Sequence, residues 1–234
     1  MNIKYKSINN FRDVIFNNIL LLCLISVFNA VYVSAANGSS DIDKSWSFKV
    51  YLDDKEIGFH NFSMIHKEQH KEIYSSARFN VKFLFINAYS YKHDNVELWQ
   101  GQCLNSINAV TDDNGDLYNV SGEADNGAFI VNTAENNNEK QNKYLPCIKT
   151  FAYWDPGFLE ETTLLNSQTG EMMEVDSEFI GTDTLRHNGE EVVARHYRLH
   201  GKDLQIDLWY SADDHWLALE SLTESGRVVR YAMP

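Results

Sequence analysis

Hydrophobic and polar residues alternate along most of the chain after about residue 45. This period of two is typical of strands with one buried face. In the first such run, Trp46, Phe48 and Val50 alternate with polar Ser47 and Lys49. The pattern predicts strands at Trp46–Leu52, Ile57–His66, Ile73–Ile86, Ala88–Trp99, Gln102–Val110, Leu117–Ser121, Ala128–Thr133, Met172–Leu185, Val192–His200, Leu204–Tyr210, Trp216–Thr223 and Val228–Met233.

Three segments between these runs have a distinct composition. Asp113-Asn114-Gly115-Asp116 predicts a hairpin turn, because Asn-Gly tolerates the positive φ angles of a type I′ turn. Ala134–Lys143 is rich in Asn and Glu without periodicity and predicts a loop. Phe158–Ser167 has apolar residues at helical spacing and predicts a short helix.

About a dozen short strands with regular turns predict an all-β, mainly antiparallel fold. We expect a single curved sheet, either a half-barrel or a sandwich, with at most one or two short helices. Residues 46–234 are long enough for one domain with a substantial core, and residues 36–45 are expected to form a short flexible segment before it.

The N-terminus has the pattern of a secretory signal peptide. Lys4, Lys6 and Arg12 precede an apolar run, Ile19–Phe28, and Val33-Ser34-Ala35 supplies the small residues of a cleavage site. The run of about ten residues is too short to span a bilayer core, which takes roughly 20. We therefore expect residues 1–35 to be removed and the rest to be periplasmic or secreted, not an integral membrane protein. The alternative is an uncleaved N-terminal anchor.

The chain without this leader has 17 basic and 32 acidic residues, a net charge of −15. Nucleic acids and anionic membranes require clustered Lys and Arg, so both are excluded as partners. Export also affects the two remaining cysteines. In an oxidising compartment Cys103 and Cys147 are expected to form a disulfide, with two free buried thiols as the alternative.

No catalytic or metal-binding motif is evident. The sequence lacks GxSxG, HExxH, a P-loop and GxGxxG. His196 and His200 lie four residues apart, which separates them by roughly 13 Å on a strand. His66 and His70 flank a turn, but no third ligand is identifiable. We predict no metal and no cofactor.

Aromatic residues gather in two segments that the disulfide would bring together. Either they form a packed core, or they form the wall of a ligand cavity with His93 and Asp155 as its nearest polar groups. The candidate ligand-binding residues are Phe83, Phe85, Tyr89, Tyr91, His93, Trp99, Phe151, Tyr153, Trp154 and Asp155.

Three stretches carry a resemblance: Arg78–Tyr89, Asp112–Gly115 and Thr150–Pro156, the last reading Thr-Phe-Ala-Tyr-Trp-Asp-Pro. Together they resemble a family of exported bacterial proteins classed only as a domain of unknown function. The likeness extends from about Trp46 to the C-terminus and implies no activity. The last three predicted strands are also similar to those of periplasmic half-barrel lipoprotein carriers, in which a helix closes the barrel over bound acyl chains. Phe158–Ser167 would have to serve as that helix.

The leading interpretation is an exported, non-enzymatic protein that binds an apolar or lipid-like ligand in the concavity of its sheet. The first alternative is a structural or interaction module of the cell envelope without a small ligand. The second is a hydrolase or isomerase that uses His93 and Asp155.

Overall fold

The computed structural model describes residues 42–83, 86–136, 138–187, 189–223 and 225–233. The predicted signal peptide, its cleavage site and residues 36–41 lie outside the described residues. The first strand begins at Lys44, two residues before the predicted start of the domain.

The described residues form fourteen strands and one turn of 3-10 helix, η1, joined by turns and loops. They are β1 (Lys44–Leu52), β2 (Lys55–His66), β3 (Lys71–Phe83), β4 (Ile86–Gln100), β5 (Cys103–Asp113), β6 (Asp116–Asp125), β7 (Ala128–Glu135), β8 (Asn138–Tyr144), η1 (Pro156–Glu160), β9 (Thr163–Leu165), β10 (Met172–His187), β11 (Glu190–Gly201), β12 (Leu204–Tyr210), β13 (Trp216–Leu222) and β14 (Val228–Ala232).

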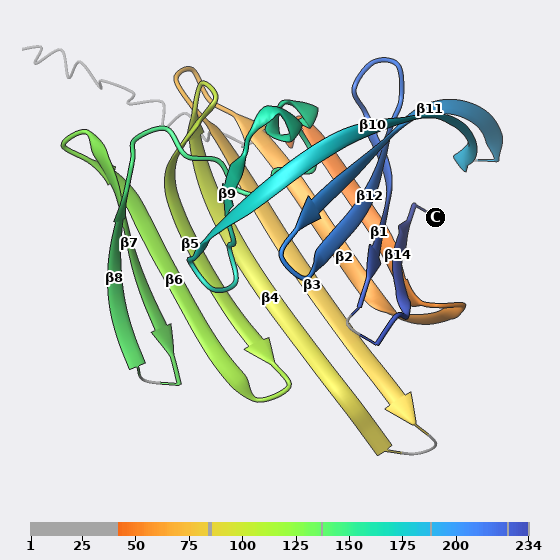
Figure 1. Ribbon diagram of the computed structural model, residues 1–234, viewed down its shortest axis with the longest axis horizontal. Coiled ribbons are helices and arrows are strands. Elements are labelled where there is room, and N and C mark those ends of the chain that lie inside the picture. Colours follow the sequence, from red (N-terminus) through yellow and green to blue (C-terminus); the bar gives the residue numbers. More distant parts are fainter. Residues whose placement is uncertain (1–41, 84–85, 137, 188, 224, 234) are drawn as a thin grey trace, which may run out of the picture. The chain divides into compact units, whose positions relative to one another are not determined.

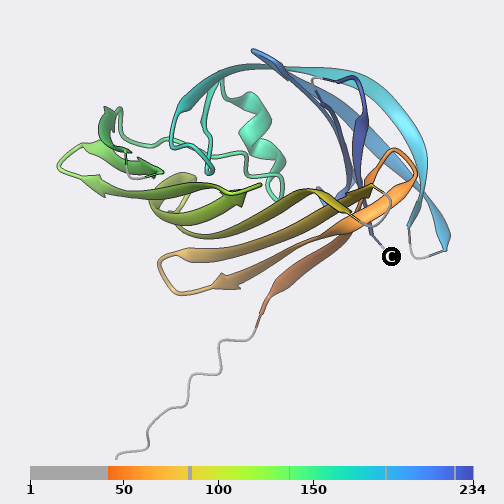
Figure 2. The ribbon, with the colours of Figure 1, turned by 90° about the horizontal axis from the view of Figure 1, so that it is seen from below.

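All fourteen strands belong to one antiparallel sheet with the order β8-β7-β6-β5-β4-β3-β2-β1-β14-β13-β12-β11-β10-β9 (Figure 1). The first and last strands pair in its middle, and β8 and β9 form its two edges. The sheet curls, and the segment between the edges, with η1, lies within the curl (Figure 2). The prediction of an all-β fold with a single curved sheet is confirmed.

Alternation of side chains creates the inner face of the sheet. On β1, Trp46, Phe48 and Val50 are buried, whereas Ser47 and Lys49 between them are exposed. Comparable residues of the other strands join them in one apolar core. Residues 145–162, which we call the crossing segment, add further buried side chains to this core: Ile148, Ala152, Trp154, Phe158 and Leu159.

The predicted disulfide is present and holds the crossing segment against the sheet. Cys103, at the start of β5, is bonded to Cys147, with their Cα atoms 4.5 Å apart. Next to the bond, the Leu104 N–H donates to the Ile148 carbonyl oxygen at 3.0 Å. Two residues further along, Thr150 forms a parallel bridge to Leu165 of β9. The segment therefore links β5 to the opposite edge of the sheet.

One local prediction is wrong, and a second is correct only in part. Most of Ala134–Lys143 is not a loop but the β7–β8 hairpin. Because β8 is an exposed edge strand, polar residues occupy both of its faces and no alternation marks it. Pairs such as Gln141 and Asn132, bonded at 2.7 Å, stabilise it instead.

Phe158–Ser167 is helical only over residues 158–160, which belong to η1. The 3-10 turn begins earlier, at Pro156, because the Asp155 side chain accepts a hydrogen bond from the Gly157 N–H. Strand β9 follows at Thr163. No helix among the described residues is long and apolar enough to cross a membrane. The Asn114-Gly115 hairpin is confirmed, with φ of 55° and 105° at these residues.

Candidate ligand-binding site

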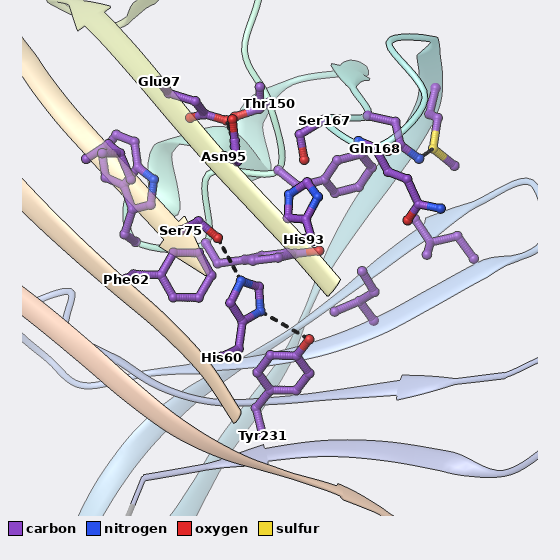
Figure 3. Close-up of a pocket in the computed structure, with 18 of the residues that line it drawn as sticks. His60, Phe62, Ser75, His93, Asn95, Glu97, Thr150, Ser167, Gln168 and Tyr231 are labelled. Atoms are coloured by element: carbon purple, nitrogen blue, oxygen red, sulfur yellow. Dashed lines mark hydrogen bonds between the residues drawn. The ribbon is translucent and has the colours of Figure 1, made fainter. Parts of the chain in front are cut away.

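A cavity of about 240 Å³ lies on the inner face of the sheet, between its strands and the crossing segment. Figure 3 shows its labelled side chains converging from β2, β3, β4, β14 and the connection before β10. Apolar and aromatic side chains form part of the lining: Phe62, Ile73, Tyr91, Phe151, Tyr153, Trp154, Met173, Leu204, Ile206 and Tyr231. Polar side chains form the rest: His60, Ser75, His93, Asn95, Glu97, Thr150, Asn166, Ser167 and Gln168.

Strand β4 supplies a row of three buried polar side chains to the cavity. His93, Asn95 and Glu97 are only 4–6 % exposed. Residues two apart on a strand point to the same face, so all three point inward. Asn95 lies opposite Ser75 of β3, and His93 lies opposite Thr111 of β5. The row and its two neighbours thus form a polar area on the inner face of the sheet.

Glu97 organises one end of the row. Its Oε1 accepts a hydrogen bond from Asn95 Nδ2 at 2.9 Å. Its Oε2 accepts from Trp99 Nε1 at 2.8 Å and from Thr150 Oγ1 at 3.2 Å. Burial raises the pKa of Glu97, and these bonds oppose the rise. The network joins β4 to the crossing segment.

Asn95 has one polar atom left over. Its amide nitrogen donates to Glu97, whereas its Oδ1 is buried and has no hydrogen-bond partner among the described residues. Nearly all buried polar atoms in folded proteins are paired. Asn95 also lines the cavity, so the unpaired acceptor belongs to the cavity wall.

Two histidines form the other end of the polar lining. His60 Nε2 lies 2.7 Å from Ser75 Oγ, and His60 Nδ1 lies 3.3 Å from the Tyr231 hydroxyl (Figure 3). His93 Nδ1 lies 2.8 Å from Thr111 Oγ1. Burial lowers the pKa of His60 to about 3 and that of His93 to about 4. Both imidazoles are neutral at neutral pH.

The turn before β10 closes the opposite side. The Tyr91 hydroxyl donates to Gln168 Oε1 at 3.1 Å, and Gln168 Nε2 donates to Asp113 at 3.3 Å. Gly170 has a φ of +71°, and a Cβ there would lie 2.3 Å from Thr133 Cγ2 of β7. The turn therefore packs directly on the sheet and holds Gln168 over Tyr91.

Five of the ten predicted site residues line the cavity: Tyr91, His93, Phe151, Tyr153 and Trp154. Trp99 lies behind it, with its ring centroid 5.3 Å from that of Trp154, so the disulfide does bring the two aromatic segments together. Tyr89 is not part of the lining. The Phe83 and Phe85 side chains lie outside the described part of the chain.

Asp155 is placed elsewhere. It caps η1, lies 3.5 Å from Lys71 Nζ and lines a different cavity from His93. The His93 ring bonds instead to Thr111. The two residues proposed as a catalytic pair thus have separate partners and separate surroundings.

Sequence reasoning missed all of the polar lining except His93: His60, Ser75, Asn95, Glu97, Thr150, Asn166, Ser167 and Gln168. It also missed the aromatic Tyr231. A signal was available in β4. Its inward positions are polar while Val96, on the outward face, is 42 % exposed. His93, Asn95 and Glu97 alternate in step with Tyr91 and Trp99 on the same face of the strand. This pattern could have indicated an internal polar site.

Comparisons with known proteins agree with this architecture. The chain resembles the crystal structure of a β-barrel-like protein of domain of unknown function DUF1849 from Brucella abortus, with a TM-score of 0.61 and 6 % sequence identity. The match covers 81 % of this chain and 94 % of that one, and at such identity it shows the fold alone. No curated protein matches the chain.

A family model identifies the sequence relationship. The model described as "Domain of unknown function (DUF6134)" matches residues 48–233, from the second buried aromatic residue of β1 to just after β14. The resemblance of the sequence to a domain of unknown function is thereby confirmed, and the chain belongs to the DUF6134 family.

Proposed function

We propose that this protein binds a small ligand in the cavity on the inner face of its curled sheet. The observation that carries the proposal is the buried Asn95 Oδ1 without a partner. Leaving a buried acceptor unpaired costs about 1–3 kcal/mol. A ligand that donates a hydrogen bond to Asn95 would recover this cost.

The lining modifies the ligand expected from the sequence. A purely apolar acyl chain would offer no hydrogen bond to Asn95 Oδ1, and burying a polar group against a hydrocarbon is unfavourable. A ligand with an apolar body and a polar end matches both parts of the lining. At about 240 Å³ the cavity holds a small molecule or one end of a longer one.

A hydrolase is the weaker candidate, although one contact favours it. A serine bonded to a histidine, as Ser75 is to His60, is the arrangement of a nucleophile and its general base. Burial lowers the pKa of His60 to about 3, far below the value near 7 that suits a base. Tyr231, rather than a carboxylate, lies on the other ring nitrogen. We therefore favour binding over catalysis.

We also propose that the protein acts outside the cytoplasm. The disulfide between Cys103 and Cys147 is compatible with an extracytoplasmic compartment, since cytosolic proteins rarely keep such bonds. The sequence pattern of residues 1–35 supports the same location.

Native mass spectrometry of the protein purified from its own compartment tests the binding proposal. We expect a bound small molecule that is lost when Ser167, on the cavity wall, is replaced by Phe. Ser121→Phe, at an exposed position of β6, is the matched control and should keep it. A clean apo mass for the wild type would favour a structural module of the cell envelope instead.

A further inference from the structure

The cavity wall offers no formal charge to a ligand. No Lys, Arg or Asp is among the described residues that line it. The groups that titrate are His60, His93, Glu97 and three tyrosines, Tyr91, Tyr153 and Tyr231. Burial lowers the pKa of both histidines and raises that of the tyrosines, so each of these five is neutral at neutral pH.

Glu97 is not available as a counter-charge. Both of its oxygens already accept hydrogen bonds from the protein, one from Asn95 and two from Trp99 and Thr150. An ammonium group that approached it would have to displace these donors. Burial also raises the pKa of Glu97, which favours the uncharged carboxyl.

Two of the aromatic side chains in the wall are held in place by the core. Tyr153 packs with its ring centroid 5.4 Å from that of Trp216 and 5.7 Å from that of Phe158, so the core fixes its ring. Trp154 is fixed against Trp99. Rigid aromatic walls beside one unpaired acceptor define a ligand with a flat or apolar body and a hydrogen-bond donor.

We propose that the ligand is an uncharged molecule that places a hydrogen-bond donor on Asn95 Oδ1 and an aromatic or apolar body against the Phe151–Trp154 wall. This inference rests on the proposed binding function and adds the ligand's chemical class. An ion would lose its hydration in the cavity without gaining a partner of opposite charge, which is strongly unfavourable. Carboxylates, fatty acids among them, and primary amines are thus excluded.

Four probes with the same ring and different substituents test this class. Benzyl alcohol is neutral with a donor, benzonitrile is neutral with an acceptor only, benzoate is an anion and benzylammonium is a cation. Their affinities can be measured by NMR titration of the oxidised protein at neutral pH. The indole N–H of Trp154, on the cavity wall, is the reporter, and that of Trp209, in a separate apolar cluster, is the internal control.

We expect benzyl alcohol to bind about tenfold more tightly than benzonitrile, because one net hydrogen bond separates them. The two ions should bind about a hundredfold more weakly than benzyl alcohol, or not at all. Asn95→Leu should abolish the preference for benzyl alcohol. Asn108→Leu, at an exposed position of the neighbouring strand β5, should leave it unchanged.

The outcomes separate the two proposals. If benzoate or benzylammonium binds as tightly as benzyl alcohol, the cavity binds a ligand but the uncharged class is wrong. If benzonitrile binds best, the amide nitrogen of Asn95 faces the cavity and the required donor is wrong. If none of the four probes shifts the Trp154 signal, both the proposed function and this inference fail.

Discussion

Acid should destabilise this protein through two buried histidines, His60 and His93. Their pKa values in the folded protein are about 3 and about 4, against an ordinary value of 6.5. Below pH 6.5 the unfolded chain takes up protons at these positions while the folded chain does not, so stability is lost as the pH falls. Above pH 6.5 neither state binds the protons, and this contribution to stability is fully present.

The size of the effect follows from the same values. Between about pH 7.5 and about pH 5, each histidine should lower the free energy of unfolding by about 2 kcal/mol, or about 4 kcal/mol together. For His60, about 2 kcal/mol is the upper end of the expected loss, because its side chain lines the cavity. Glu97 acts in the opposite direction: its raised pKa makes its contribution fall as the pH rises above 4.5.

The test compares guanidinium unfolding of the wild type with that of a His60→Gln, His93→Gln double variant across this pH range. Because Glu97 is present in both proteins, the difference between them isolates the contribution of the two histidines. We expect the pH dependence of the double variant to be about 3–4 kcal/mol smaller than that of the wild type. His200→Gln, at a partly buried position of β11, is the control and should keep the pH dependence of the wild type. Equal pH dependence in the wild type and the double variant would refute the reasoning.

Three further predictions concern the crossing segment and the cavity. Replacing Cys103 and Cys147, 44 residues apart, with Ala should lower the free energy of unfolding by about 4 kcal/mol in denaturant titrations; a loss under about 1 kcal/mol would contradict the anchoring role of the bond. Gly170→Ala should lower the free energy of unfolding, measured by thermal unfolding, by at least about 1 kcal/mol more than Gly226→Ala does. Both glycines have a positive φ, but only at Gly170 would the added Cβ lie 2.3 Å from another atom. Equal losses would show that the turn moves to make room for the Cβ. A fluorophosphonate probe should leave Ser75 unlabelled, because His60 is a weak base. If the wild type is labelled and Ser75→Ala is not, the result would support a hydrolase.

The sheet could be predicted from the sequence because its alternation is a local signal. On β1, apolar residues at every second position mark the buried face directly. The edge strand β8 could not be predicted this way, since an exposed edge places no hydrophobic requirement on either of its faces. Its pairing with β7 depends on contacts across a hairpin that no single-strand pattern contains.

The site was less predictable for a different reason. The aromatic half of the lining is visible as a local cluster, and the disulfide explains its convergence. The polar half comes from distant parts of the chain: His60 and Tyr231 are 171 residues apart, and Thr150 reaches Glu97 across 53. Such contacts follow from the pairing of β1 with β14 and from the path of the crossing segment, and neither has a local sequence signal.

The polar row of β4 also explains why a cavity exists at this place. An apolar side chain packed onto Asn95 would offer no donor to its unpaired Oδ1, so closing the opposing wall on this part of the sheet would gain no hydrogen bond. Where the inner face is apolar, as at Phe48 and Trp216, the rings do close, with centroids 4.3 Å apart. The row therefore supports the proposal that this part of the inner face holds a ligand.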